Sequence, residues 1–285
     1  MSEKKHEPPK ESFYHSLLES DIVTWMEPLC DRGKYALRFG DGHFEAVLPA
    51  MASKTPWVYI KVHEELDCTL NTSVLFNTVF RVLGEKWVPE RCQNCWKVTV
   101  SLDTLLQLFT MERLQMRQKY PCKCGIEVRT TVSKNYGAYF YNTTLEEAQE
   151  CYAFVRKMVD EEPELGPDTR VQLKRGCSEF EFLAGDSSKW EVSPYQRHVE
   201  SLIFQYVHSG ANYSPQPEHV KRHVHRRWIE HAFAVGDKTY LLFTGGKPLS
   251  PNYTEYHQGD PRENKGAAGA KAVTKSAPLK KKRSK

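Results

Sequence analysis

The spacing of the cysteines is the feature of this sequence that most constrains its fold. Cys92 and Cys95 are separated by two residues, and Cys122 and Cys124 follow as a second pair separated by one residue. A structural zinc site commonly joins two short cysteine pairs that lie far apart in the sequence, and it fixes the segments that carry them. The pattern therefore predicts a zinc ion that ties these two segments together.

Cys177 competes with Cys122 for one ligand position, because a glycine precedes it and a β-bulge there would re-aim its side chain. The expected ligands are Cys92, Cys95, Cys124 and Cys177, with Cys122 as the alternative fourth ligand. Four thiolates leave no open coordination position, so the zinc is expected to be structural. Unligated thiols and an iron–sulfur cluster are the alternatives that these residues allow.

The thiols are expected to be reduced or bound to metal rather than joined as disulfides. The chain opens with polar residues, and no apolar run approaches the ~20 residues that a membrane-spanning helix needs. Neither a signal peptide nor a membrane partner is expected, and the protein is predicted to be intracellular, in the cytoplasm or the nucleus.

The composition supports a large hydrophobic core. Of the 285 residues, 40% are hydrophobic and 12% are aromatic, which is well above the content of disordered chains. An α+β fold is expected, with a mixed or antiparallel sheet and packed helices. The expected division is a folded body over residues 1–256 and a disordered basic tail over 257–285, with an N-terminal subdomain at 11–90 and a cysteine-containing β-β-α-β core at 91–190.

Hydrophobic periodicity and turn signals predict the individual elements of this fold. The expected helices cover residues 11–29, 102–116, 145–159, 194–207 and 217–233, and the expected strands cover 35–39, 44–48, 57–62, 126–132, 138–141, 170–183 and 240–243. The strand 170–183 has one irregularity, because its apolar residues change phase near Gly176. A β-bulge at this glycine is the expected cause.

Beyond that bulge, Glu179 and Glu181 are expected on one face of the strand, about 7 Å apart. Lys174 and Arg175 precede them. Paired carboxylates beside cations can bind a divalent metal or serve as acid and base, which makes these four residues the candidate catalytic set of an enzyme. The other interpretation is a solvated strand face without chemistry.

The segment 218–231 contains four histidines and four basic residues on one predicted helix. Its basic residues, Lys221, Arg222, Arg226 and Arg227, are candidates for contact with nucleic-acid phosphates. Two of the histidines lie one turn apart, but the neighbouring cations disfavour a metal site between them. A solvated basic face is the alternative.

The tail carries most of the positive charge. The formal net charge is +4 for the whole chain, and residues 257–285 contribute +7, which leaves −3 for the remainder. The basic cluster at the end of the tail, Lys280, Lys281, Lys282 and Arg283, is typical of nuclear import signals and of nonspecific phosphate contact.

Together these features favour a zinc-stabilised protein that binds nucleic acid through the histidine-rich helix and the basic tail. Two alternatives belong to other classes. One is an enzyme that acts on a phosphate-bearing substrate, such as a nucleotide or nucleic acid, with Glu179 and Glu181 at its centre, and the other is an adaptor that binds proteins without catalysis.

Overall fold

The structure is a computed structural model of the chain. It describes residues 55–61, 68, 70–129, 132–208 and 216–249, together with residues 24–26 and the two strands at 35–38 and 43–46. By contacts, the chain divides into residues 1–247 and 248–285, and all but two residues of the second unit lie outside the described part.

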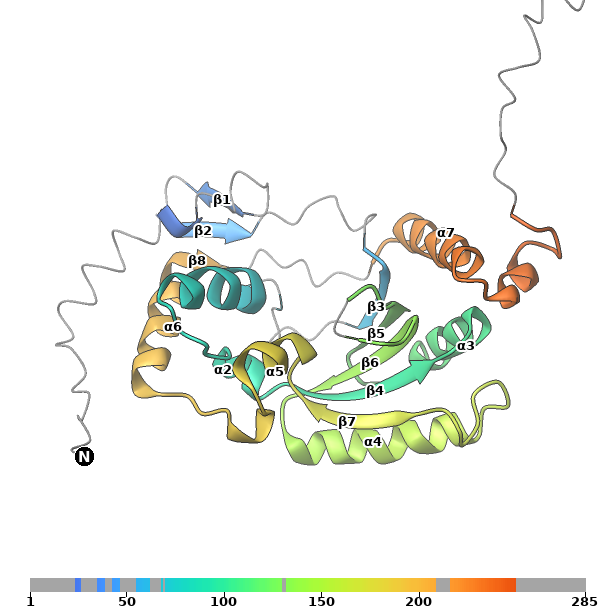
Figure 1. Cartoon of the computed structure of the whole chain (residues 1–285), viewed down its shortest axis with the longest axis horizontal. Coiled ribbons are helices and arrows are strands. Elements are labelled where there is room, and N and C mark those ends of the chain that lie inside the picture. Colours follow the sequence, from blue (N-terminus) through green and yellow to red (C-terminus); the bar gives the residue numbers. More distant parts are fainter. Residues whose placement is uncertain are drawn as a thin grey trace, which may run out of the picture. The chain divides into compact units, whose positions relative to one another are not determined.

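A five-stranded antiparallel sheet is the centre of the described fold (Figure 1). Its strands, in spatial order, are β3 (Trp57–Lys61), β5 (Cys122–Ile126), β6 (Tyr136–Asn142), β4 (Trp96–Leu102) and β7 (Val171–Arg175). β4 is the second strand from one edge, and its residues Val98 and Val100 have no exposed surface. An α+β fold with an antiparallel sheet is thus confirmed.

The chain runs through this sheet as β4, α3 (Leu105–Gln115), β5, β6, α4 (Leu145–Asp160) and β7. This is the connectivity of the ferredoxin-like, or split βαβ, arrangement. The helix expected at 102–116 corresponds to α3, but no strand was expected at β4, although Trp96–Leu102 alternates apolar and polar residues. β3 adds a fifth strand beside β5.

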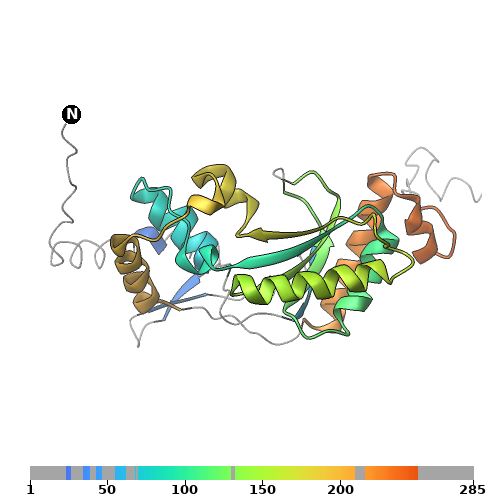
Figure 2. The same ribbon diagram turned by 90° about the horizontal axis from the view of Figure 1, so that it is seen from below.

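α3 and α4 cover one face of the sheet (Figure 2). Thr144 caps the beginning of α4, since its hydroxyl accepts a hydrogen bond from the Glu147 amide. The side of α4 that faces the sheet is apolar and includes Cys151 and Val155, neither of which is exposed. Helical spacing of the apolar residues therefore directs both helices onto one hydrophobic layer.

The remaining helices are short or lie beyond the sheet. They are η2 (Leu70–Phe80), a π-helix, α2 (Glu90–Gln93), α5 (Ser178–Ala184), the 3-10 helix η3 (Ser187–Lys189), α6 (Pro194–Tyr206), α7 (Glu218–Ala234) and the 3-10 helix η4 (Lys238–Phe243). η2 and α6 share a second hydrophobic cluster that includes Val74 and Phe80 of η2 and Ile203 of α6. The helices expected at 194–207 and 217–233 are confirmed.

A second, smaller sheet contains β1 (Tyr35–Arg38), β2 (His43–Ala46) and β8 (Val207–His208). β1 and β2 form the predicted antiparallel hairpin, and β8 lies parallel to β2. Apart from the short helical segment 24–26, the helix expected over 11–29 lies outside the described residues.

Two predicted strands are wrong, and a third is displaced. The strand expected at 126–132 shares only Ile126 with β5, and residues 127–129 are not in a strand. The segment 170–183 forms β7 only as far as Arg175 and then turns at Gly176, whose φ of 61° is a left-handed conformation that favours glycine. It continues as α5 rather than as a bulged strand. Residues 240–243 belong to the 3-10 helix η4, which begins after the capping residue Asp237.

No disulfide joins the seven cysteines of the described part. No helix within the described ranges is long and apolar enough to cross a membrane.

Candidate functional site: a pocket of thiols and lysines

A pocket of about 100 Å³ lies between the uncovered face of the sheet and the segments around η2, α2 and α5. We call it the thiol–lysine pocket, because thiols and ammonium groups from separate elements line it. Its lining consists of Cys68, Asn71, Thr72, Cys92, Cys95, Lys97, Lys123, Arg129, Tyr139, Tyr141, Gly176, Cys177 and Glu179.

Strand alternation explains which sheet residues reach this pocket. Successive side chains of a strand point to opposite faces. In β6, Tyr139 and Tyr141 line the pocket, whereas Ala138 and Phe140 are buried on the side that α3 and α4 cover. In β5 the same alternation sends Lys123 into the pocket.

Aromatic rings surround the Lys123 ammonium group. Its Nζ lies 4.7 Å from the ring centroid of Trp57, 5.5 Å from that of Tyr59, 5.8 Å from that of Tyr139 and 5.9 Å from that of Tyr141. The negative faces of such rings attract a cation. The rings hold the side chain in place, but they supply no counter-charge.

Lys97 is even more enclosed, with 5% of its surface exposed. Its Nζ donates to the Cys177 Sγ at 2.5 Å and lies 5.5 Å from the Tyr141 ring centroid. Within the described ranges, no carboxylate forms an ion pair with Lys97 or Lys123. Two enclosed ammonium groups therefore share one pocket without an acidic partner, which is a costly arrangement unless another negative charge is present.

The four thiols come from three regions of the chain. Cys68 precedes η2, Cys92 and Cys95 flank the end of α2, and Cys177 caps the beginning of α5. Cys92 and Cys95 are buried, Cys177 is half-buried and Cys68 is exposed. Burial raises the pKa of Cys95 to about 12 and that of Cys92 well above its usual value, so both are neutral thiols at neutral pH unless a metal binds them.

These thiols line the same space without meeting at one point. Across the described part of the chain, no three or more histidine, cysteine, aspartate or glutamate side chains are arranged closely enough to hold a metal ion. Ligation of a metal thus requires the cysteine side chains to turn toward the middle of the pocket.

The structure brings together only some of the predicted metal ligands. Cys92, Cys95 and Cys177 share the pocket, but Cys122 and Cys124 point away from it. Cys122 accepts a hydrogen bond from the Gln118 amide, and Cys124, paired in register with the buried Val58, lies near Glu112 of α3. The reason is the strand itself, because residues on either side of Lys123 must face α3.

Cys68 is the pocket thiol that sequence reasoning missed. It stands alone in the sequence, and no neighbouring cysteine marks it as part of a motif. The sequence indicated Cys68 only indirectly, because a four-cysteine site needs a fourth ligand besides Cys92, Cys95 and Cys177.

Arg129 closes one side of the pocket through a network of charges. Its guanidinium donates to both carboxylate oxygens of Glu127, at 2.8 and 2.6 Å, and to Glu179 of α5 at 3.2 Å. The Tyr139 hydroxyl also donates to Glu127, at 2.6 Å. Burial alone would raise the pKa of Glu127, but these hydrogen bonds and the guanidinium charge hold it below its usual value. Arg129 is therefore balanced by carboxylates, unlike the two lysines.

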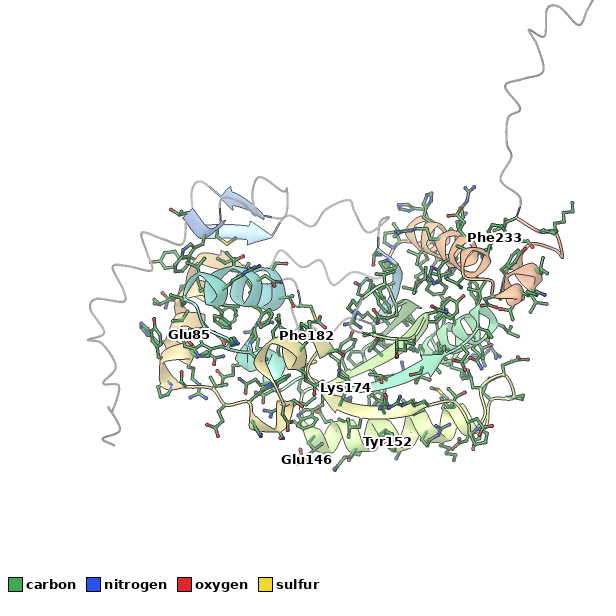
Figure 3. All side chains as sticks on the ribbon, viewed as in Figure 1. Glu85, Glu146, Tyr152, Lys174, Phe182 and Phe233 are labelled. Carbon is green, nitrogen blue, oxygen red and sulfur yellow. The ribbon has the colours of Figure 1, made fainter. Side chains whose placement is uncertain are left out.

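The predicted pair of carboxylates does not form, because Glu179 and Glu181 belong to a helix, on which residues two apart lie about 200° around the axis from each other. Glu179 pairs with Arg129, whereas Glu181 accepts from the Ser187 hydroxyl and lies 3.7 Å from Lys174. Figure 3 shows Lys174 at the end of β7, beside α5.

Arg175, the other cation of that predicted set, is used structurally. Its guanidinium donates to the backbone carbonyls of Gln93 and Ser187 at 2.6 and 2.7 Å. These bonds hold the end of α2 against η3, so Arg175 takes no part in a site with Glu179 or Glu181.

The predicted nucleic-acid contacts of α7 lie on a different surface from the pocket. Arg222, Arg226 and Arg227 are exposed, while the opposite side of the helix is buried through Val220, Val224, Trp228 and Ala232. Lys221 is less available, because it pairs with Glu218 and its side chain is 19% exposed. The tail residues Lys280, Lys281, Lys282 and Arg283 lie outside the described residues.

Comparison with known proteins supplies no identity for either surface. No protein-family model matches the chain, and no curated protein or solved structure is significantly similar to it.

Proposed function

We propose that this protein binds nucleic acid through the exposed basic face of α7, with a further contribution from the basic tail, and that a zinc ion stabilises its fold. The single observation that carries the nucleic-acid proposal is the division of α7 into a buried apolar side and an exposed basic side. We call the exposed set, Arg222, Arg226 and Arg227, the α7 arginines.

All three α7 arginines are exposed, and Arg227 also donates to the Thr55 carbonyl at 3.5 Å. The side chain of Arg226 is 79% exposed, and its one ion pair, with Glu230, joins two exposed groups one turn apart. Such exposed pairs contribute little to stability, so a phosphate can replace the carboxylate at small cost. Phosphate contacts supply most of the affinity in nonspecific nucleic-acid binding.

The face of the sheet opposite α3 and α4, which lines the thiol–lysine pocket, is a weaker candidate for this contact. Aromatic side chains of β6 lie there, and sheets of this connectivity bind bases by stacking in RNA-recognition modules. However, Tyr139 is only 6% exposed, because the elements around the pocket cover it. A base has no room to stack on that ring, which favours α7.

The test is the salt dependence of binding. Fluorescence anisotropy with single-stranded and double-stranded oligonucleotides, at about 50 and 200 mM salt, should show affinity that falls as salt rises. Substitution of Arg222, Arg226 and Arg227 by Ala removes three phosphate contacts. On duplex DNA it should reduce the slope of log K against log salt by roughly 2 to 3, since each contact contributes about 0.9.

A matched control removes three exposed charges elsewhere, at Arg113, Lys157 and Arg197, whose side chains are 50%, 76% and 59% exposed. This control has the same net charge as the α7 variant and should keep most of the affinity. Equal losses in the two variants would show that total charge, rather than α7, determines binding. Absence of binding by the full chain at about 50 mM salt would reject the proposal.

The geometry gives less support to a phosphate-processing enzyme. The two carboxylates on which that alternative depended have different partners, since Glu179 pairs with Arg129 and Glu181 lies near Lys174. A general base needs a free lone pair within reach of a substrate proton. Glu179 and Glu181 do not share one site in which one carboxylate could act as the base and the other as the acid.

A further inference from the structure

We infer that the thiol–lysine pocket is a structural zinc site, with four thiolates as ligands and two lysines that balance their charge. The ligands are Cys68, Cys92, Cys95 and Cys177, and the balancing lysines are Lys97 and Lys123. The inference rests on the proposed stabilisation by zinc, and it names the residues that hold the ion.

The first argument is the convergence of the thiols. Four of the seven cysteines in the described part line one pocket of about 100 Å³, although they come from segments far apart in the sequence. A structural zinc ion takes four sulfur ligands at about 2.3 Å each, and this pocket offers four thiols. Because the described side chains form no group that already holds a metal, ligation requires the four thiols to turn toward the centre of the pocket.

The second argument is charge. A zinc ion with four thiolates carries a net charge of −2, and the Lys97 and Lys123 ammonium groups carry +2 in the same pocket. Arg129 does not enter this balance, because it pairs with Glu127 and Glu179, and these three groups together carry −1. The zinc site thus supplies the negative charge that the two enclosed lysines lack among the described carboxylates.

The third argument is the contact between Lys97 and Cys177. The Lys97 ammonium donates directly to the Cys177 sulfur. Hydrogen bonds to ligand atoms orient the ligands of a metal site, and their removal commonly weakens metal affinity 10-fold to 100-fold. A lysine that donates to a thiolate ligand acts as a positioning residue for the metal.

The test begins with metal analysis of the full-length protein, purified under reducing conditions with zinc in the growth medium. About one zinc per chain is expected. Cys68→Ser should lower the zinc content to well under half an equivalent, whereas Cys124→Ser, which changes a buried thiol on the other face of β5, should leave it unchanged. Loss of zinc in Cys124→Ser with retention in Cys68→Ser would overturn the ligand set.

A cobalt-substituted sample keeps the test decisive if a cysteine variant fails to fold. The intensity of the sulfur-to-cobalt charge-transfer bands counts the thiolates in the unchanged sequence, and four are expected. A spectrum with two or fewer thiolates would overturn the site. Iron in place of zinc in the purified protein would overturn the identity of the metal.

The lysines are tested by competition with a chelator. Lys97→Gln and Lys123→Gln should each weaken zinc binding about 10-fold or more. Lys134→Gln is the matched control, because Lys134 lies 5.1 Å from the Tyr139 ring centroid but does not line the pocket. Unchanged zinc affinity in the first two variants would overturn their role in charge balance.

The rival occupant of the pocket is a small anion. Metal-free protein that inorganic phosphate stabilises, with the effect abolished by Lys97→Gln, would assign the pocket to an anion and overturn the zinc site. The nucleic-acid proposal is tested separately, since substitution of the α7 arginines should leave the zinc content at one equivalent. Protein without zinc that still binds oligonucleotides would therefore overturn only the zinc site.

Discussion

Gly176 determines where Cys177 lies. Its positive φ turns the chain from β7 into α5, and its amide donates to the Cys95 carbonyl at 2.8 Å. A β-carbon at this position would lie 2.5 Å from the ring of Trp190, which is far too close. Glycine is therefore required before Cys177 for two reasons. The backbone there is left-handed, and the Trp190 ring leaves no space for a β-carbon.

Gly176→Ala should therefore lower the free energy of unfolding by about 3 kcal/mol, because left-handed strain costs about 1–2 kcal/mol and the displaced indole adds to it. Thermal or denaturant unfolding measures this loss. Gly166→Ala is the matched control, since Gly166 has a φ of 74° and open space around it. That variant should lose only about 1 kcal/mol. Equal losses would show that contact with Trp190 is unimportant.

At the scale of elements, the turn between α7 and η4 completes the beginning of α3. The Asp237 carboxylate accepts hydrogen bonds from the Leu105 amide at 2.6 Å and from the Tyr136 hydroxyl at 2.9 Å. The Thr239 hydroxyl accepts from the Leu106 amide at 3.2 Å. The first turn of a helix has amides without partners inside the helix. Here, a distant segment supplies their acceptors.

Asp237→Ala should lower the free energy of unfolding by about 2 kcal/mol, because it leaves helix amides and a buried phenol without an acceptor. Burial alone would raise the pKa of Asp237, but hydrogen bonds from Thr239, Leu105 and Tyr136 hold it below its usual value. The stabilisation is therefore complete above about pH 4, the pKa of an unfolded aspartate, and is lost as the pH falls through the folded value.

Unfolding of the wild type and the variant at several pH values checks this prediction. The difference between them should be largest above about pH 4 and should shrink in more acidic buffers. Asp186→Ala is the control, because the Asp186 carboxylate accepts only from Ser188 of its own turn. A difference that grows as the pH falls would contradict the expected sign.

For the whole molecule, the sequence predicts elements with a regular period better than it predicts where they meet. α4 follows its apolar spacing, and β1 and β2 lie where strands were expected at 35–39 and 44–48. The strand predicted after Gly176 was wrong. The change of apolar phase at this glycine suggested a β-bulge, whereas its left-handed backbone conformation ends the strand.

The candidate site shows the same limit. Cys92 and Cys95 are recognisable from their spacing, but the choice among the other thiols depends on which strand face points to the pocket. Strand alternation puts Lys123 on the opposite face of β5 from Cys122 and Cys124. The register of β5 with β3 and β6 determines which of these faces lines the pocket. Register is a property of the assembled sheet, so neither Cys68 nor the lysines could be assigned from the sequence.

The contribution of the tail is also a question about the whole molecule. Residues 257–285 carry +7, and residues 1–256 carry −3. A chain that ends before His257 should bind oligonucleotides more weakly at about 50 mM salt and with a flatter salt dependence, because fewer counterions are released. It should keep residual binding that substitution of the α7 arginines removes. Undiminished affinity of the truncated chain would show that the tail makes no contact.

The acceptors that Asp237 and Thr239 supply to α3 have a consequence for synthesis on the ribosome. Leu105 precedes Asp237 by 132 residues, so the chain emerges with the first turn of α3 incomplete. At the usual rate of about 5 to 20 residues per second, the missing acceptors follow roughly ten seconds later. During that interval the amides of Leu105 and Leu106 lack these acceptors, and the emergence of Asp237 and Thr239 supplies them.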